Sequence, residues 1–156
     1  MKLLTLLGLL TVCAVSVSCS TSRAPQSSND PLALAFDHQA LQVADLSKSA
    51  AFYSDVLGLA EIAKPSGPEI IRWFDLGNGN ELHLIALDEP QTVPKATHFA
   101  LSVQDLDAFL THLRSRGIRY SDWPGTDGGV SVRADGVRQV YIQDPDGHWI
   151  EINTSY

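Results

Sequence analysis

The 156-residue sequence contains only two cysteines, Cys13 and Cys19, and both lie near its start. This count excludes a disulfide framework and a CxxC motif, and it leaves residues 20–156 without a thiol. Basic residues are also few, since 11 Lys and Arg stand against 18 Asp and Glu, for a formal net charge of −7. Such an acidic chain, which has no Lys/Arg run, lacks the basic surface of nucleic-acid-binding proteins. We therefore expect no nucleic-acid partner.

Long hydrophobic runs are absent from the sequence after its first residues. The overall composition, 44% hydrophobic and 19% charged, is that of an ordinary soluble globular protein. The length allows one domain of average size, or two half-size modules that share a core.

The one apolar run covers residues 3–17 and follows a short positive start at Met1–Lys2. It is too short for a transmembrane helix, which needs about 20 residues, and it suits a secretory signal. Small residues precede Cys19, and this pattern resembles a bacterial lipoprotein signal. The resemblance implies a signal peptide over 1–18 and a flexible, Ser-rich tether over 19–35 that starts at lipidated Cys19. We expect a lipid-anchored protein of the bacterial cell envelope, with a soluble secreted or periplasmic protein as the alternative.

An internal repeat covers most of the remaining chain. The segment HQALQVADL, which starts at His38, aligns with HFALSVQDL, which starts at His98, and six of the nine positions are identical. Each segment predicts an apolar strand that ends at an Asp, a good N-cap for a following helix. Apolar periodicity predicts these helices over Ser47–Leu57 and Leu106–Arg116.

Three short strands are predicted after each helix. They are expected at Ala60–Ala63, Ile70–Leu76 and Glu81–Leu87 in the first copy, and at Arg119–Trp123, Gln139–Gln143 and Trp149–Asn153 in the second. The pattern predicts an α+β domain over 36–156, built from two tandem βαβββ modules at about 36–88 and 96–154.

Four polar residues occupy equivalent positions of the two copies, where a strand would ordinarily carry an apolar side chain. They are His38 and His98 in the first strands, and His83 and Glu151 in the last strands. If the copies pack about a pseudo-twofold axis, these side chains converge. Three imidazoles and one carboxylate predict a site for one divalent metal ion, Zn, Fe, Ni or Mn. A single histidine of this kind is more often packed or bonded to the backbone, but four equivalent positions favour the metal site.

Two acids are candidates for catalysis. Glu81 lies two residues before His83 and so on the same strand face, where it is a substitute ligand or a supporting acid. Glu151 is the other acid on the strand faces of the expected site, so Glu81 and Glu151 are the candidate catalytic bases.

Aromatic residues of the same strands are candidates for contact with a substrate. Trp73, Tyr141 and Trp149 could line a pocket, with core or interface packing as an equal alternative. Two further histidines receive no role: His112 is predicted on a solvated helix face, and His148 is predicted as a turn residue.

Four segments carry a resemblance to a known family. They are His38 to Leu46, FYSDVLGL from Phe52, THFALSV from Thr97, and DPDGHWIEI from Asp144. Together they resemble the vicinal oxygen chelate superfamily, which includes glyoxalases, extradiol dioxygenases, fosfomycin-resistance enzymes and bleomycin-binding proteins. The resemblance implies that two βαβββ modules form an open, cup-shaped mixed sheet around a metal. It also implies a homodimer, with sites formed within one chain or across two.

The same resemblance implies a function. Family ligands fall on His38, His98 and Glu151, and the fourth falls on His83, where many glyoxalase-like members have a glutamate. The implied activity is a metal-dependent enzyme that binds two neighbouring oxygens of a small substrate, either a glyoxalase-like lyase or isomerase or an extradiol-type dioxygenase. The alternatives are a metal-free small-molecule-binding protein of the bleomycin-resistance type and a structural lipoprotein. A complete set of four ligands favours the enzyme.

Overall fold

The computed structural model describes residues 32–64, 66–88 and 92–155. The predicted signal peptide and Cys19 therefore lie outside the described residues. Residues 36–156 form one compact unit. In the described part of the chain, no helix has the length and the apolar character that a membrane span needs.

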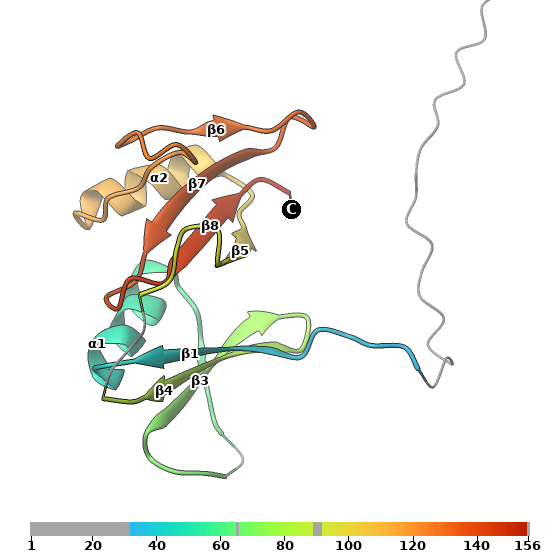
Figure 1. The fold of residues 1–156 in the computed structure, drawn as a ribbon, viewed down its shortest axis with the longest axis vertical. Coiled ribbons are helices and arrows are strands. Elements are labelled where there is room, and N and C mark those ends of the chain that lie inside the picture. Colours follow the sequence, from blue (N-terminus) through green and yellow to red (C-terminus); the bar gives the residue numbers. More distant parts are fainter. Residues whose placement is uncertain (1–31, 65, 89–91, 156) are drawn as a thin grey trace, which may run out of the picture. The chain divides into compact units, whose positions relative to one another are not determined.

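The unit is built on two four-stranded mixed sheets, one from each copy of the repeat (Figure 1). The first copy contains β1 (His38–Val43), α1 (Leu46–Ala51), η1 (Phe52–Val56), β2 (Glu61–Ile62), β3 (Ile71–Gly77) and β4 (Asn80–Ala86). The second contains β5 (His98–Ser102), α2 (Leu106–Ser115), β6 (Ser131–Val132), β7 (Arg138–Gln143) and β8 (Trp149–Asn153). The strand orders, β1-β4-β3-β2 and β5-β8-β7-β6, match each other. This confirms the predicted α+β fold of two βαβββ modules.

Equivalent aspartates start the two helices. The Asp45 carboxylate accepts the backbone N–H of Lys48, and the Asp105 carboxylate accepts that of Ala108, each at 2.9 Å. These bonds satisfy backbone donors that a helix leaves unpaired at its first turn. In the first module the α-helix is shorter than predicted, because a π-helical turn, η1, follows it and buries Phe52, Tyr53 and Val56.

One predicted strand is wrong. Residues Arg119–Trp123 form no strand, and within them Ser121 makes two isolated antiparallel bridges, to Tyr141 and to Asp127. The Asp122 carboxylate accepts the N–H groups of Gly125 and Thr126 and so turns the chain away from the sheet. The outer strand of this sheet is β6 instead.

Each helix covers one face of its own sheet. One buried core cluster contains residues of the helical segments α1, η1 and α2 and of both sheets, among them Leu41, Val43, Phe74, Leu82, Leu84, Val140, Ile142, Ile150 and Ile152. Because side chains alternate along a strand, His38, His83, His98 and Glu151 fall on the opposite faces. The fold thus places the candidate ligands of both modules away from the core.

A turn between β7 and β8 joins the two modules. The Asp146 carboxylate accepts the N–H of Ala44 at 2.9 Å and the hydroxyl of Ser49 at 2.7 Å, both in the first module. The Asp144 carboxylate accepts the Tyr53 hydroxyl at 2.9 Å. His148 is therefore more than a turn residue, because it is only 7% exposed and its Nδ1 lies 2.8 Å from Asp144.

His112 also differs from its prediction. It is not on a solvated face, since its side chain is partly buried and its Nε2 lies 3.0 Å from the backbone oxygen of Val56. This contact adds a second link between the modules.

Candidate functional site

His98 and Glu151 form the candidate site of the second module. His98 on β5 and Glu151 on β8 approach to 3.4 Å between Nε2 and Oε2. The His98 Nδ1 lies 2.8 Å from the backbone oxygen of Lys95, which can only accept a hydrogen bond, so Nδ1 carries the proton. In the neutral form of His98, the lone pair of Nε2 would then face this carboxylate oxygen. Two facing acceptors without a proton between them suit a bound cation.

Hydrogen bonds on both oxygens hold the Glu151 carboxylate. Tyr141 donates its hydroxyl to Oε2, and Asn153 donates its amide to Oε1, each at 2.7 Å. Gln139 in turn donates to the Tyr141 hydroxyl oxygen at 2.7 Å. Burial, and then the bond to Glu151, raise the pKa of Tyr141, so that the phenol stays protonated at neutral pH. Glu151 is thus a fixed, buried carboxylate with one oxygen beside His98.

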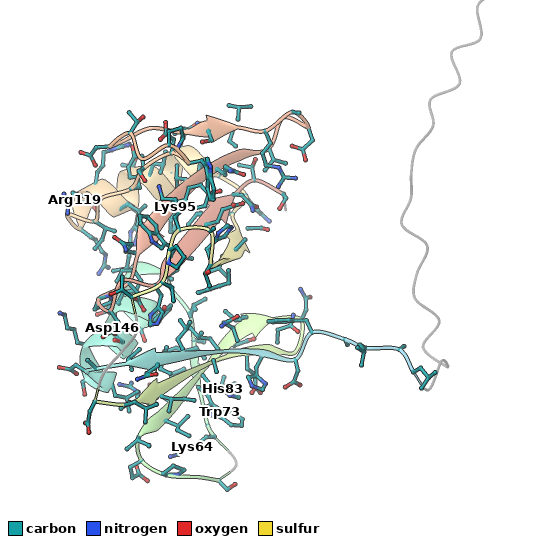
Figure 2. The ribbon with its side chains drawn as sticks, in the orientation of Figure 1. Lys64, Trp73, His83, Lys95, Arg119 and Asp146 are labelled. Atoms are coloured by element: carbon teal, nitrogen blue, oxygen red, sulfur yellow. The ribbon has the colours of Figure 1, made fainter. Side chains whose placement is uncertain are left out.

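His38 and His83 form the candidate site of the first module. Their rings stack at 4.3 Å between centroids, and Trp73 stacks on the other face of His83 at 4.1 Å. Figure 2 shows Trp73 and His83 side by side. Both histidines also have an acidic neighbour: Nε2 of His83 lies 2.8 Å from Glu81, and Nδ1 of His38 lies 2.6 Å from Asp37.

The structure thus brings the four predicted ligands together as two pairs. Among the residues that it describes, no group of three or more His, Cys, Asp or Glu side chains is arranged to hold a metal ion. Each pair has one member on a strand at the end of its sheet order, His38 on β1 and His98 on β5. The imidazole and carboxylate donors are of types that bind a divalent metal. Within one copy of the chain they form two separate pairs, His38 with His83 and His98 with Glu151.

Sequence reasoning missed several residues around Glu151. Gln139 and Asn153 support the carboxylate, and their alternation with Tyr141 and Glu151 along β7 and β8 was the available signal. Trp123 was also missed, because it was assigned to a strand. The centroid of its ring lies 5.4 Å from the ring centroid of Tyr141 and 6.2 Å from that of His98.

A cavity of about 290 Å³ borders the second pair. His98, His148 and Trp149 line it together with residues 39–42 of β1. Trp149 therefore lines a cavity, and the Lys95 ammonium lies over its ring at 4.5 Å from the centroid. Contact with a substrate stays a prediction.

Comparisons with known proteins place this geometry in a family. Residues 35–152 match the model of the Glyoxalase/Bleomycin resistance protein/Dioxygenase superfamily. The "Probable lactoylglutathione lyase" of Synechocystis sp. is 30% identical over 74% of this chain and 91% of that protein. The "Metallothiol transferase FosB" of Shouchella clausii is 29% identical over 76% of this chain and 78% of that protein.

A solved structure, "Oxidase ChaP-H2", superposes with a TM-score of 0.64 at 28% identity and covers 79% of this chain and 94% of that chain. The names of the lyase, the transferase and the oxidase state different reactions. The chain belongs to the glyoxalase/bleomycin resistance protein/dioxygenase superfamily.

Proposed function

We propose that this protein is a divalent-metal-dependent enzyme that acts on a small substrate with two neighbouring oxygen atoms. The observation that carries the proposal is the contact of His98 with Glu151, where Nε2 of the imidazole lies 3.4 Å from a buried carboxylate oxygen. Without a cation or an extra proton, this arrangement places two acceptors against each other.

Four residues would hold the metal: His38, His83, His98 and Glu151. When bound, the metal supplies a Lewis acid that polarises substrate oxygens. Tyr141 and Asn153 keep the Glu151 carboxylate in place, and the backbone oxygen of Lys95 keeps the proton of His98 on Nδ1. Glu81 is the candidate base, because its carboxylate lies beside His83 on the same strand face.

The relatives support the coarse function and leave the reaction open. Their names include a lyase, a transferase and an oxidase. We keep a lyase or isomerase and a dioxygenase as the two reaction classes for this chain. Identification of the bound metal discriminates between them, because oxygen chemistry requires a redox-active ion such as Fe²⁺.

We also propose that the site is completed in a homodimer. β1 and β5 are both end strands of their sheets, and each carries one histidine of a pair. An end strand has unpaired backbone groups and readily accepts another strand. Pairing of the first module of one copy with the second module of another would bring His38 and His83 to His98 and Glu151.

Metal analysis of the purified protein tests the proposed function. We expect the parent to bind one metal ion per chain, and we expect His98→Ala and Glu151→Ala each to lose it, because each removes a ligand. His112→Ala is the matched control, since His112 contacts a backbone oxygen in the helical region and should leave the metal content unchanged. A folded parent that binds no divalent metal contradicts the proposal.

That contrary result would favour the alternative, a metal-free small-molecule-binding protein of the bleomycin-resistance type. One observation favours it specifically: Trp73, His83 and His38 form a continuous stack of flat rings on the strand face opposite the core. Such a surface binds a planar ligand without a metal.

The location of the protein is a separate proposal. We propose that Cys19 carries a lipid that anchors the chain in the bacterial cell envelope, on the strength of the apolar run and the small residues before it. Cys19→Ser should release the protein from the membrane fraction, and retention of the variant there would contradict the proposed anchor.

A further inference from the structure

Lys95 connects two parts of the second module, the His98 site and the loop of residues 121–129. Its ammonium donates to the hydroxyl of Ser121 at 3.1 Å and to the backbone oxygens of Asp122 at 2.9 Å and Trp123 at 3.3 Å. Its own backbone oxygen lies 2.8 Å from the Nδ1 of His98. A single residue thus holds the loop with its side chain and the candidate ligand with its main chain.

The ammonium of Lys95 makes all of its described contacts with groups of the protein itself. An ammonium has three N–H donors, and three oxygens of the loop occupy them. The ammonium also lies over the rings of Trp149, at 4.5 Å, and Tyr141, at 5.3 Å. Cation–π contacts of this kind hold the side chain further in place. These contacts favour a structural role for Lys95, in which it holds the loop in place, over a role in binding an anionic substrate.

The clamped loop carries Trp123 to the candidate site. Its ring contacts both His98 and Tyr141 edge to face. Trp123 is nevertheless 48% exposed, so packing alone holds it weakly, and the Lys95 hydrogen bond to its backbone oxygen fixes the turn from which it projects.

We propose that Lys95 is a positioning residue of the metal site. By anchoring itself to the loop, it fixes the position of its own backbone oxygen, which holds the His98 proton on Nδ1 and leaves Nε2 for the metal. The part of this inference that concerns metal affinity rests on the proposed function. The part that concerns the His98 tautomer and the Trp123 loop does not need a metal.

Three variants of the full chain test the role of Lys95. Lys95→Met keeps an unbranched apolar stem but loses all three donors, and Lys95→Arg keeps the charge and the donors. Lys64→Met is the matched control, because Lys64 likewise donates to backbone oxygens, those of Gly67 and Pro68, in a loop of the first module. Figure 2 labels both lysines, Lys64 in the first module and Lys95 beside the second.

The first measurement is the tautomer of His98, read from ¹⁵N chemical shifts of its ring at a pH where the ring carries one proton. We expect the proton on Nδ1 in the parent and in Lys64→Met, a mixture of tautomers in Lys95→Met, and recovery in Lys95→Arg. Near-ultraviolet circular dichroism should change in parallel in Lys95→Met, because Trp123 loses its fixed contact with Tyr141. An unchanged His98 tautomer in a folded Lys95→Met protein would overturn the proposal.

The second measurement is the affinity for Zn²⁺ by competition with a chelator. Loss of a group that orients a metal ligand weakens binding by about 10-fold to 100-fold, and we expect this for Lys95→Met only. If the parent binds no Zn²⁺ but the tautomer changes as expected, the proposed function fails while the positioning role stands. If all variants bind Zn²⁺ equally, the metal-site role of Lys95 fails while the proposed function stands.

Discussion

Glu151 shows how a buried acid is kept in one position at the scale of single residues. The residue is 7% exposed, and Tyr141 and Asn153 donate to its two carboxylate oxygens. Burial of a carboxylate is unfavourable unless such donors replace water. The hydrogen-bond network of Gln139, Tyr141, Glu151 and Asn153 therefore stabilises the module as well as the site.

The substitution Tyr141→Phe tests how much this hydrogen-bond network contributes to stability. The substitution removes the only donor to Oε2 among the described contacts and leaves the Gln139 amide without its acceptor. Leaving a buried polar group unpaired costs about 1–3 kcal/mol. Because two groups lose their partner, we expect the free energy of unfolding in urea to fall by roughly 2–6 kcal/mol.

Tyr120→Phe is the matched control for that loss. Tyr120 is also buried, but its hydroxyl accepts a hydrogen bond from Arg114, whose guanidinium can turn to water. We expect it to cost no more than about 1 kcal/mol. Equal destabilisation by the two variants would contradict a special role for the Tyr141 hydroxyl.

At the residue scale the sequence predicted the candidate ligands but not the residues that hold them in position. His38, His83, His98 and Glu151 stood out because each interrupts an apolar strand at an equivalent place of the repeat. Lys95 gave no such signal, because its partners in the loop lie more than 25 residues away in the sequence and only the folded loop brings them near.

At the scale of elements, the turn between β7 and β8 has an unexpected role. Its two aspartates accept hydrogen bonds from Ala44, Ser49 and Tyr53 of the first module. Burial tends to raise the pKa of Asp144, but hydrogen bonds and the charge of His148 outweigh this and lower it. The hydrogen bond to Asp144 raises the pKa of His148 in turn.

These shifts predict a pH dependence of stability. A raised His148 pKa stabilises the fold at pH values below the unfolded pKa of about 6.5, and this contribution is lost as the pH rises through the folded pKa. A lowered Asp144 pKa stabilises the fold above about pH 3.9 and is lost as the pH falls through the folded value. The Asp144–His148 pair should therefore contribute most between about pH 4 and 6.5.

His148→Gln measures that contribution, because it removes the titrating group of the pair. We expect the difference in unfolding free energy between parent and variant to be larger at pH 5.5 than at pH 8.5, as measured with urea. The other histidines are present in both proteins, so their titration cancels in the difference. A difference that grows toward alkaline pH would contradict the account.

Sequence patterns predicted most elements, and the exceptions have local causes. The helix starts were predictable from Asp45 and Asp105, because capping is a short-range interaction. The false strand at Arg119–Trp123 was not avoidable from apolar periodicity, since the turn that displaces it depends on hydrogen bonds of one carboxylate, Asp122.

At the scale of the whole molecule, duplication explains both the fold and the divided site. Each module has its own sheet and helix and contributes to one buried core, and each presents a pair of candidate ligands on the strand face opposite that core. The two-module fold was predictable because the repeat is visible in the sequence. How the two pairs meet was not, since strand pairing between copies leaves no sequence pattern of its own.

The most direct test of a metal site shared between two copies uses two variants, each of which lacks one ligand. His38→Ala removes a ligand of the first module and Glu151→Ala removes one of the second, so neither variant alone should bind the metal. In an equimolar mixture that exchanges subunits, each mixed dimer regains one intact site, and roughly a quarter of the parent metal content should return. If the mixture binds no more metal than the two variants measured separately, the site is not formed between two copies.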